Sequence, residues 1–281
     1  MAAATVGQSD QYFNDFSSAL RYWRGKRGYS QLHLSTVSEV SQRHISFLES
    51  GRAQPSKEMI LKLGLTLEIP LRHRNVMLLA AGFAPAYLER RLSDPELGAV
   101  RRALDFMLAQ QAPFPSLVVD RLWRLQLHNA PAAFLFRWLL DLPATQPIPG
   151  DGALNVLKLM LDPKGVRQHL VNWEEIAADL MTWIQREAMA DGPEGEAGIL
   201  LRELAAFPGI NAGALAPNLD HRALPFLPVM IRKDGVELRL FTTITTLGTP
   251  HDVTVHELRI ESFFPADEQT EAWFRNAAAC S

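Results

Sequence analysis

Hydrophobic residues recur at helical spacing through the N-terminal part of the chain. From Phe13 to Arg27, the apolar side chains of Phe16, Leu20 and Trp23 lie four and three residues apart, and Gly28 follows. That spacing puts the three side chains on one face of a helix, and glycine suits the left-handed residue that often ends one. The pattern therefore predicts a first amphipathic helix over these residues.

Two shorter helical patterns follow between Tyr29 and Gly51, with a tight joint between them. Ser30 and Ser41 open them, because a serine hydroxyl can accept a hydrogen bond from the free N–H groups of a helix's first turn. Gly51 suits the end of the second helix. The stretch predicts a helix, a turn and a helix around a small shared core, formed by Leu34, Val37, Val40, Ile45 and Leu48.

Two more helices complete the predicted N-terminal domain, which spans residues 1–83. Ser56 is the expected N-cap of the fourth helix, and Pro70 stands where a fifth helix would begin before Gly82. Residues 84–96 mix two prolines with charged side chains and are interpreted as a linker. The second domain is expected over residues 97–281 and opens with a helix.

The hydrophobic period then changes. Residues 115–120 and 122–129 show the short alternating runs that are typical of two strands, and a helix is expected after Asn129. A single long helix is predicted from Asp162, with a stripe that is either a dimer seam or a face packed on a sheet: Val166, Leu170, Trp173, Ala177, Leu180 and Ile184.

The C-terminal part is rich in Val, Ile, Thr and Phe. Three further strands are predicted over residues 224–231, 236–247 and 252–264, followed by a last helix over 267–279. In the last strand His256 shares a face with Leu258, whereas Val253 points the other way, which requires cover on both sides or a bulge. The fold class is α+β: an all-α five-helix domain, then an antiparallel sheet with helices.

Charge divides the chain in the same place. Residues 21–74 carry ten basic and four acidic side chains, a net charge of +6; because the whole chain is at -3, the remainder is at -9. A basic head on an acidic body is typical of one DNA-facing module joined to another kind of domain. The single cysteine, Cys280, fits a reducing compartment, and we find no signal peptide or membrane-spanning run. We therefore expect a cytoplasmic protein with no membrane partner.

The polar face of the second short helix predicts contacts with double-stranded DNA. Amide and guanidinium groups at a helix N-terminus can read base edges in the major groove, while cations and hydroxyls hold phosphates. The candidates for base contacts are Ser41, Gln42, Arg43, His44 and Ser46. The candidates for phosphate contacts are Lys26, Arg27, Gln31, Arg52 and Lys57.

This segment resembles the helix-turn-helix of the Xre and lambda-type repressor family. The matching residues are Ser30-Gln31, Leu34, Val40-Ser41-Gln42, Ile45-Ser46 and Leu48-Glu49-x-Gly51. The sequence departs from the family at Ser35, where alanine is usual, and at Glu39, where glycine is usual at the turn. A non-glycine residue at positive φ costs about 1–2 kcal/mol, so Glu39 is expected to strain the turn. The resemblance implies a lambda-repressor-like domain of five helices.

The C-terminal part resembles the MmyB-like ligand-binding domain. The resemblance is carried by the stretch from Thr246 to Asp267 and by the strand that ends at Asn129 before a helix. It implies a PAS-like fold whose cavity binds small apolar molecules, fatty acids among them; the alternative is a filled core. The ligand-binding candidates are Trp123, Leu125, Leu127, Asn129, Leu240, His256, Leu258 and Ile260.

Motifs of enzymes and metal sites are missing from the sequence. It contains no Gly-x-Ser-x-Gly, no phosphate-binding glycine loop, no cysteine pair and no His-Glu-x-x-His. His251 and His256 would point to opposite faces of the predicted strand and could not share a metal. We expect no catalytic residues, no metal and no cofactor.

These patterns predict a transcription regulator that binds a near-palindromic operator as a homodimer and senses a small apolar effector. One alternative is a repressor whose C-terminal domain only dimerises or binds a partner protein. The other is a ligand-binding protein or enzyme with a vestigial DNA-binding head.

Overall fold

The computed structural model describes residues 15–191, 194–210, 228–248 and 250–279, and they form two compact units. The head unit comprises the chain up to Arg90 together with the segment 249–256, and the sheet unit comprises residues 91–248 and those from Glu257 onward. The predicted linker is thus divided between the two units, since residues 84–90 belong to the head.

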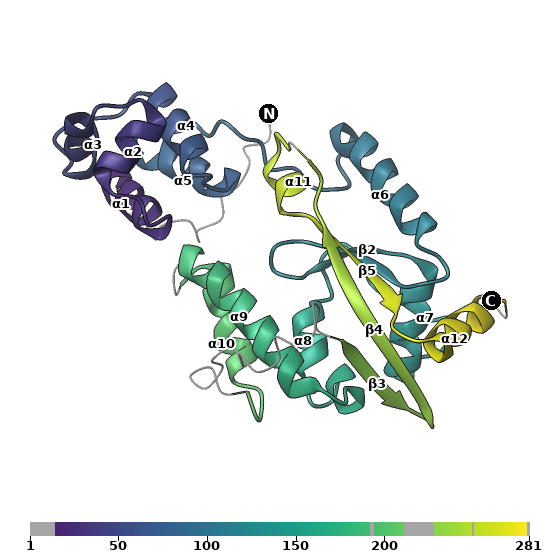
Figure 1. The fold of residues 1–281 in the computed structure, drawn as a ribbon. Helices are drawn as coiled ribbons and strands as arrows, with labels where there is room; N and C mark the ends of the chain where they lie inside the picture. The colour runs from purple at the N-terminus through teal and green to yellow at the C-terminus, as the bar shows by residue number, and fades with distance from the viewer. Residues whose placement is uncertain (1–14, 192–193, 211–227, 249, 280–281) are drawn as a thin grey trace. The chain divides into compact units, whose positions relative to one another are not determined.

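The head unit contains the five predicted helices (Figure 1): α1 (Phe16–Lys26), α2 (Gln31–Ser38), α3 (Gln42–Glu49), α4 (Lys57–Thr66) and α5 (Leu71–Ala80). Each of the three predicted serine caps forms. The hydroxyl oxygens of Ser30, Ser41 and Ser56 accept hydrogen bonds from the third backbone N–H beyond them, at 3.0, 3.2 and 3.2 Å. These caps fix where α2, α3 and α4 begin.

The core of the head unit takes one or more residues from each helix, all fully buried: Leu20, Leu34, Ile45, Leu63 and Met77. The prediction that Val37 belongs to the shared core of α2 and α3 is wrong, because 45% of this residue is exposed. It lies three residues after Leu34 but on the exposed side of α2.

The sheet unit holds a five-stranded antiparallel sheet in the order β2-β1-β5-β4-β3. The strands are β1 (Ser116–Val119), β2 (Leu125–His128), β3 (Val229–Lys233), β4 (Val236–Thr245) and β5 (Arg259–Pro265). Its helices are η1 (Pro95–Leu97), α6 (Gly98–Gln110), α7 (Ala130–Leu139), α8 (Val156–Leu161), η2 (Val166–His169), α9 (Trp173–Asp191), α10 (Glu196–Ala205) and α12 (Glu268–Ala279). The α+β class is confirmed.

Helices cover both faces of this sheet. Leu104 and Leu108 of α6 pack with Val118 and Ile260 on one face. On the other face Leu117 packs in a cluster with α7, α8, α9 and α10. The alternation of Leu117 and Val118 between two apolar layers explains why β1 is buried throughout.

Two predicted elements are different in the structure. The helix predicted from Asp162 is broken into η2 and α9 by a β-bridge between Leu170 and Ile231 and a turn at residues 171–172. There the Asn172 amide donates to the Pro228 carbonyl (2.7 Å) and its oxygen accepts from the Met230 N–H (3.1 Å). The strand predicted over 252–264 begins as a short helix, α11 (Val253–Glu257), and only then becomes β5. In each case pairing with a distant segment replaces the local pattern.

The strands β2 and β3 have different ends from those predicted. β2 begins at Leu125, because residues 120–124 form a turn in which the Asp120 carboxylate accepts hydrogen bonds from two backbone N–H groups. β3 extends to Lys233, and part of the run predicted for it, residues 224–227, lies outside the described residues.

Glu39 adopts the left-handed conformation predicted for the turn, with a φ of 54°. Glu39→Gly should raise the free energy of unfolding of the head unit by about 0.5–1 kcal/mol, because relief of the strain exceeds the entropy cost of glycine. Its ion pair with Lys62, at 3.6 Å and exposed, adds little. Urea titrations measure the effect. The matched control is Glu39→Ala, which keeps the strain; equal stabilisation by both substitutions would show that strain is not the cause.

Candidate nucleic-acid interface and ligand pockets

The N-terminal end of α3 presents two exposed polar side chains, Gln42 and Arg43. Ser41 caps the helix just before them, and the Arg43 guanidinium lies 5.3 Å from the centroid of the Phe47 ring. His44 is half-buried. In helix-turn-helix proteins this end of the second helix enters the major groove. The exposure of Gln42 and Arg43 at this end is what the predicted base contacts require, and those contacts stay a prediction.

Three of the predicted phosphate-binding side chains are also exposed. Arg52 lies just beyond α3, Lys57 opens α4, and Lys26 ends α1. The Lys26 ammonium group lies 4.8 Å from the centroid of the Trp23 ring, which fixes its stem against the helix. All three are exposed on the head unit, as the phosphate contacts predicted for them require.

Two other predicted phosphate contacts have intramolecular partners. Arg27 donates to the Leu67 carbonyl (2.7 Å) and the Glu68 carbonyl (2.9 Å), which ties the end of α1 to the end of α4. The Gln31 amide donates to the Glu49 carboxylate at 2.8 Å. Whether either residue contacts DNA stays a prediction, but both already have a structural role.

The buried carboxylate of Glu49 joins three helices. It accepts two hydrogen bonds from Arg24 of α1, at 2.5 and 3.0 Å, and one from Gln31 of α2, while Arg21 donates to the Glu49 carbonyl at 2.6 Å. Burial raises the pKa of Glu49, but hydrogen bonds from Arg24 and Gln31 outweigh this and hold the pKa below its usual range. The burial of Glu49 could have been predicted from the sequence, because Glu49 lies four residues after Ile45 and therefore on the buried face of α3.

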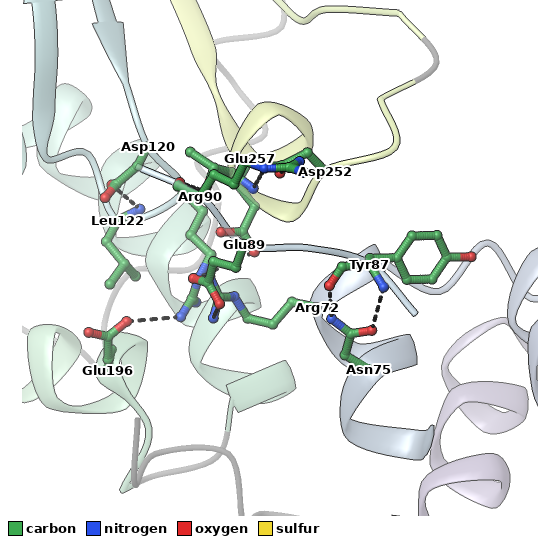
Figure 2. A network of polar contacts seen from close by, with 12 residues as sticks. Arg72, Asn75, Tyr87, Glu89, Arg90, Asp120, Leu122, Glu196, Asp252 and Glu257 are labelled. Carbon is green, nitrogen blue, oxygen red and sulfur yellow. Dashed lines mark hydrogen bonds and ion pairs between the residues drawn. The ribbon is translucent and has the colours of Figure 1, made fainter. Parts of the chain in front are cut away.

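The linker is bound to the head unit by its own polar contacts (Figure 2). The Asn75 side chain of α5 accepts from the N–H groups of Ala86 and Tyr87, both at 3.0 Å, and donates to the Tyr87 carbonyl at 2.7 Å. Arg72 pairs with Glu89. The chain up to Arg90 is therefore an ordered extension of α5.

The segment that contains α11 returns to this extension. The Val253 N–H donates to the Leu88 carbonyl (2.8 Å), and the buried Asp252 carboxylate pairs with Arg90 at 3.0 Å (Figure 2). The same carboxylate accepts from the Thr254 N–H at 2.9 Å and so caps α11. Residues far apart in the sequence thus form one connected polar group in the head unit.

The predicted ligand-binding residues do not line one cavity. Trp123 and Leu125 belong to the cluster beneath α9, whereas Leu127, Leu258 and Ile260 face α6. Leu240 packs in a third cluster, with Phe274, and His256 lies on α11 in the head unit rather than on a strand. The sequence predicted that His251 and His256 point to opposite faces of one strand. That prediction is wrong, because His256 lies in a helix.

Asn129 is buried, and its side chain is fully engaged. Its oxygen accepts from the N–H groups of Ser116 and Ala132, both at 3.0 Å, and its amide donates to the carbonyls of Phe114 (2.8 Å) and Leu108 (3.2 Å). With these four bonds the side-chain oxygen accepts two hydrogen bonds and the NH₂ group donates two, which is the full capacity of an amide. Its role in the fold is to cap α7 and to join it to β1 and α6.

Two apolar pockets lie in the sheet unit. The interior one, between the sheet and α7, is lined by residues such as Leu117, Leu135 and Phe263 and has a volume of only about 30 Å³. The other is an open groove of about 1140 Å³ between α7 and α12, with Phe134, Trp138 and Phe274 among its walls. A small molecule needs roughly 300–1,000 Å³, so of these two apolar pockets the groove is the one with room for a small molecule in this conformation.

A buried carboxyl group lies in the central strand. Glu261 of β5 is paired with Leu117 of β1 and Ile244 of β4, and burial raises its pKa to about 7, although a hydrogen bond with Thr242 opposes the shift. The group is 93% buried, since its exposed fraction is 7%. An uncharged Glu261 is therefore the favoured form in the folded sheet below neutral pH.

The described part of the chain offers no obvious metal site. No three His, Cys, Asp or Glu side chains there lie close enough to hold an ion. In the same residues no helix combines the length and the apolarity needed to cross a bilayer.

Comparisons with known proteins match both units. The family model described as the MmyB-like transcription regulator ligand binding domain matches residues 100–277, and the one described as helix-turn-helix matches residues 20–73. No curated protein matches the chain. A solved structure entitled "Structure of an RNA-binding Light-Oxygen-Voltage Receptor" is 13% identical, with 100% of this chain and 70% of that chain covered and a TM-score of 0.27, a similarity too low to support an argument.

Stability should depend on pH through Glu261. Between about pH 4.5 and 7 the unfolded chain releases this proton and the folded chain keeps it, so the free energy of unfolding should fall by up to about 1.4 kcal/mol per pH unit. Above pH 7 this loss should level off. Glu261→Gln should flatten the profile, measured by urea unfolding from pH 5 to 8, whereas the exposed control Glu237→Gln should not. Parallel profiles for wild type and Glu261→Gln would contradict the assignment.

Removal of the Asp252 carboxylate should loosen α11. Asp252→Ala deletes the acceptor of the Thr254 N–H and the partner of Arg90, so amide hydrogen exchange in residues 252–256 should accelerate by about tenfold or more. Asp105→Ala, which removes an exposed ion pair with Arg101, is the matched control and should change nothing there. Unaltered exchange in Asp252→Ala would mean that other contacts hold the segment.

Proposed function

We propose that this chain, which belongs to the MmyB-like transcription regulator family, binds a near-palindromic operator as a homodimer and responds to a small apolar ligand. The two matched regions make this chain a DNA-binding transcription regulator with a ligand-binding domain. The observation that carries the DNA-reading part of the proposal is the exposure of Gln42 and Arg43 at the capped start of α3.

Roles on DNA follow from the geometry of the head unit. Gln42 and Arg43 would read base edges, because an amide and a guanidinium can each form paired hydrogen bonds with a purine. Arg52, Lys57 and Lys26 would neutralise phosphates and fix the register of α3 in the groove. The bonds of Arg27 and Gln31 to the protein support a different role for those two residues, the orientation of α1 and α2.

A dimer would place two copies of α3 on successive turns of the major groove. The spacing of about 34–36 Å between such half-sites matches one turn of B-DNA, and two weak contacts together give useful affinity. The ligand would act by binding one dimer geometry better than another, and its influence cannot exceed that difference in affinity.

A second candidate is a repressor whose C-terminal domain only dimerises or binds a partner protein. The small interior cavity favours it, because about 30 Å³ holds no more than about two waters and the clusters around it are closely packed. In this function the DNA-binding roles are unchanged and no small molecule alters them.

Selection of bound fragments from random DNA tests the proposal. An enriched motif with two related halves, bound by two chains, is the expected result at moderate salt. Failure to enrich any motif would contradict sequence-specific regulation, and a motif without symmetry would contradict the dimer.

Substitutions should separate base contacts from phosphate contacts. Arg43→Ala should cost about 1–3 kcal/mol on the selected motif and relax sequence preference, since a purine-reading group is lost. Lys57→Ala should weaken binding to specific and random DNA alike. It should also reduce the slope of the logarithm of the binding constant against the logarithm of the salt concentration by about one. Fluorescence anisotropy over a range of salt measures both, with the exposed Arg232→Ala as control. Equal losses on specific and random DNA for both substitutions would contradict these roles.

A further inference from the structure

We infer that the groove between α7 and α12 is a ligand site, and that it takes a largely apolar, flat aromatic molecule with one anionic group, which Arg137 holds. This inference rests on the proposed ligand response and adds the site and the class of ligand. It differs from the expectation that the ligand lies inside the sheet unit, beneath the sheet.

Size excludes the interior in this conformation and admits the groove. The interior cavity of about 30 Å³ is bounded mostly by buried side chains, and a ligand there would have to displace residues such as Leu117 or Leu135. The groove of about 1140 Å³ is already open and needs no such change. A ligand therefore enters the groove without the cost of opening a packed core.

The walls of the groove favour rings. α7 and α12 lie side by side (Figure 1), and Trp138 and Phe134 of α7 have ring centroids 5.0 and 5.4 Å from the ring of Trp273 in α12. Phe274, at 1% exposure, forms the floor. Aromatic and proline surfaces such as these stack on planar ligands through offset and edge contacts.

Two charged side chains, Arg137 and Asp141, line the groove, and among the described residues only Asp141 has an ion-pair partner. Asp141 lines the groove, but both its carboxylate oxygens accept from Lys233, at 2.8 and 3.0 Å. Arg137 uses its Nε to donate to the Gln146 carbonyl at 2.8 Å and forms no ion pair within the described residues. Its terminal nitrogens can bind a carboxylate or sulfonate, which a guanidinium holds through two parallel hydrogen bonds.

The groove is also connected to the sheet. Phe274 belongs both to the groove and to the cluster of Ile231, Leu238 and Leu240 on β3 and β4. A ligand that presses on Phe274 therefore contacts the strands through a single layer of side chains. This is the physical route by which occupancy of the groove can alter the sheet unit.

Two probes with the same rings and different charge test the inference. 8-Anilinonaphthalene-1-sulfonate is an aromatic anion whose fluorescence rises in an apolar site, and N-phenyl-1-naphthylamine is its uncharged counterpart. We expect one sulfonate probe per full-length chain, with competition by 1-naphthoate and none by dodecanoate. Stronger competition by dodecanoate would overturn the aromatic class.

Substitutions locate the site. Arg137→Gln should weaken binding of the sulfonate probe by about tenfold or more, because the charged partner of the sulfonate is lost. Binding of the uncharged probe, which has no such group, should be unchanged. Ala278→Trp fills the groove and should abolish binding of both probes, whereas Ala103→Trp, on the exposed side of α6, should not. Binding that is insensitive to Ala278→Trp, or equally weakened for both probes by Arg137→Gln, would overturn the assignment.

The outcomes for the groove and for the regulator are separable. Circular dichroism and binding to the selected DNA motif show whether each substituted chain is folded, independently of either probe. If the probes behave as expected and no DNA motif is enriched, the regulator proposal fails and the groove stands. If a motif is enriched and the groove substitutions leave probe binding unchanged, the groove fails alone.

Discussion

The buried carboxylate of Glu49 holds the DNA-facing part of the head unit together, because side chains from two other helices converge on it. A buried charge of this kind is stable only while its partners are present, and loss of one partner typically costs about 3–5 kcal/mol. The network orients α3 relative to α1 and α2. The hydrogen bond from Gln31 to Glu49 also explains why Gln31, in the first turn of α2, is half-buried. The exposed end of α3 can then be specialised for recognition because its other end is fixed.

Local chemistry made much of the head unit predictable from the sequence. Serine caps and the left-handed residue at Glu39 depend on contacts within a few residues, so the pattern of the chain contains them. The same holds for the cap at Asn129 before α7. The resemblance to known families added the order of the domains, and the family models at residues 20–73 and 100–277 confirm it.

The misses arise where distant segments override local preference. A helical stripe from Val166 to Ile184 is interrupted because Asn172 pairs with the backbone at β3, more than fifty residues away in sequence. Likewise, the apolar run near Val253 forms a helix because Leu88 and Arg90 supply its partners. The ligand candidates were chosen by strand alternation, which gives a face but not the helix that covers it. The groove depends on α12 lying beside α7, and no spacing within either helix indicates that pairing.

The route of the chain has a consequence for how such proteins can be rearranged. It passes from the head unit to the sheet unit after Arg90, returns after Gly248, and leaves again after His256. A fragment that ends at residue 90 therefore lacks part of its own unit: the Leu88 carbonyl and Arg90 lose the partners that Val253 and Asp252 provide. Exchange of the head for one from another regulator would have to carry the loop between β4 and β5 with it, so a cut at residue 90 does not separate two interchangeable modules.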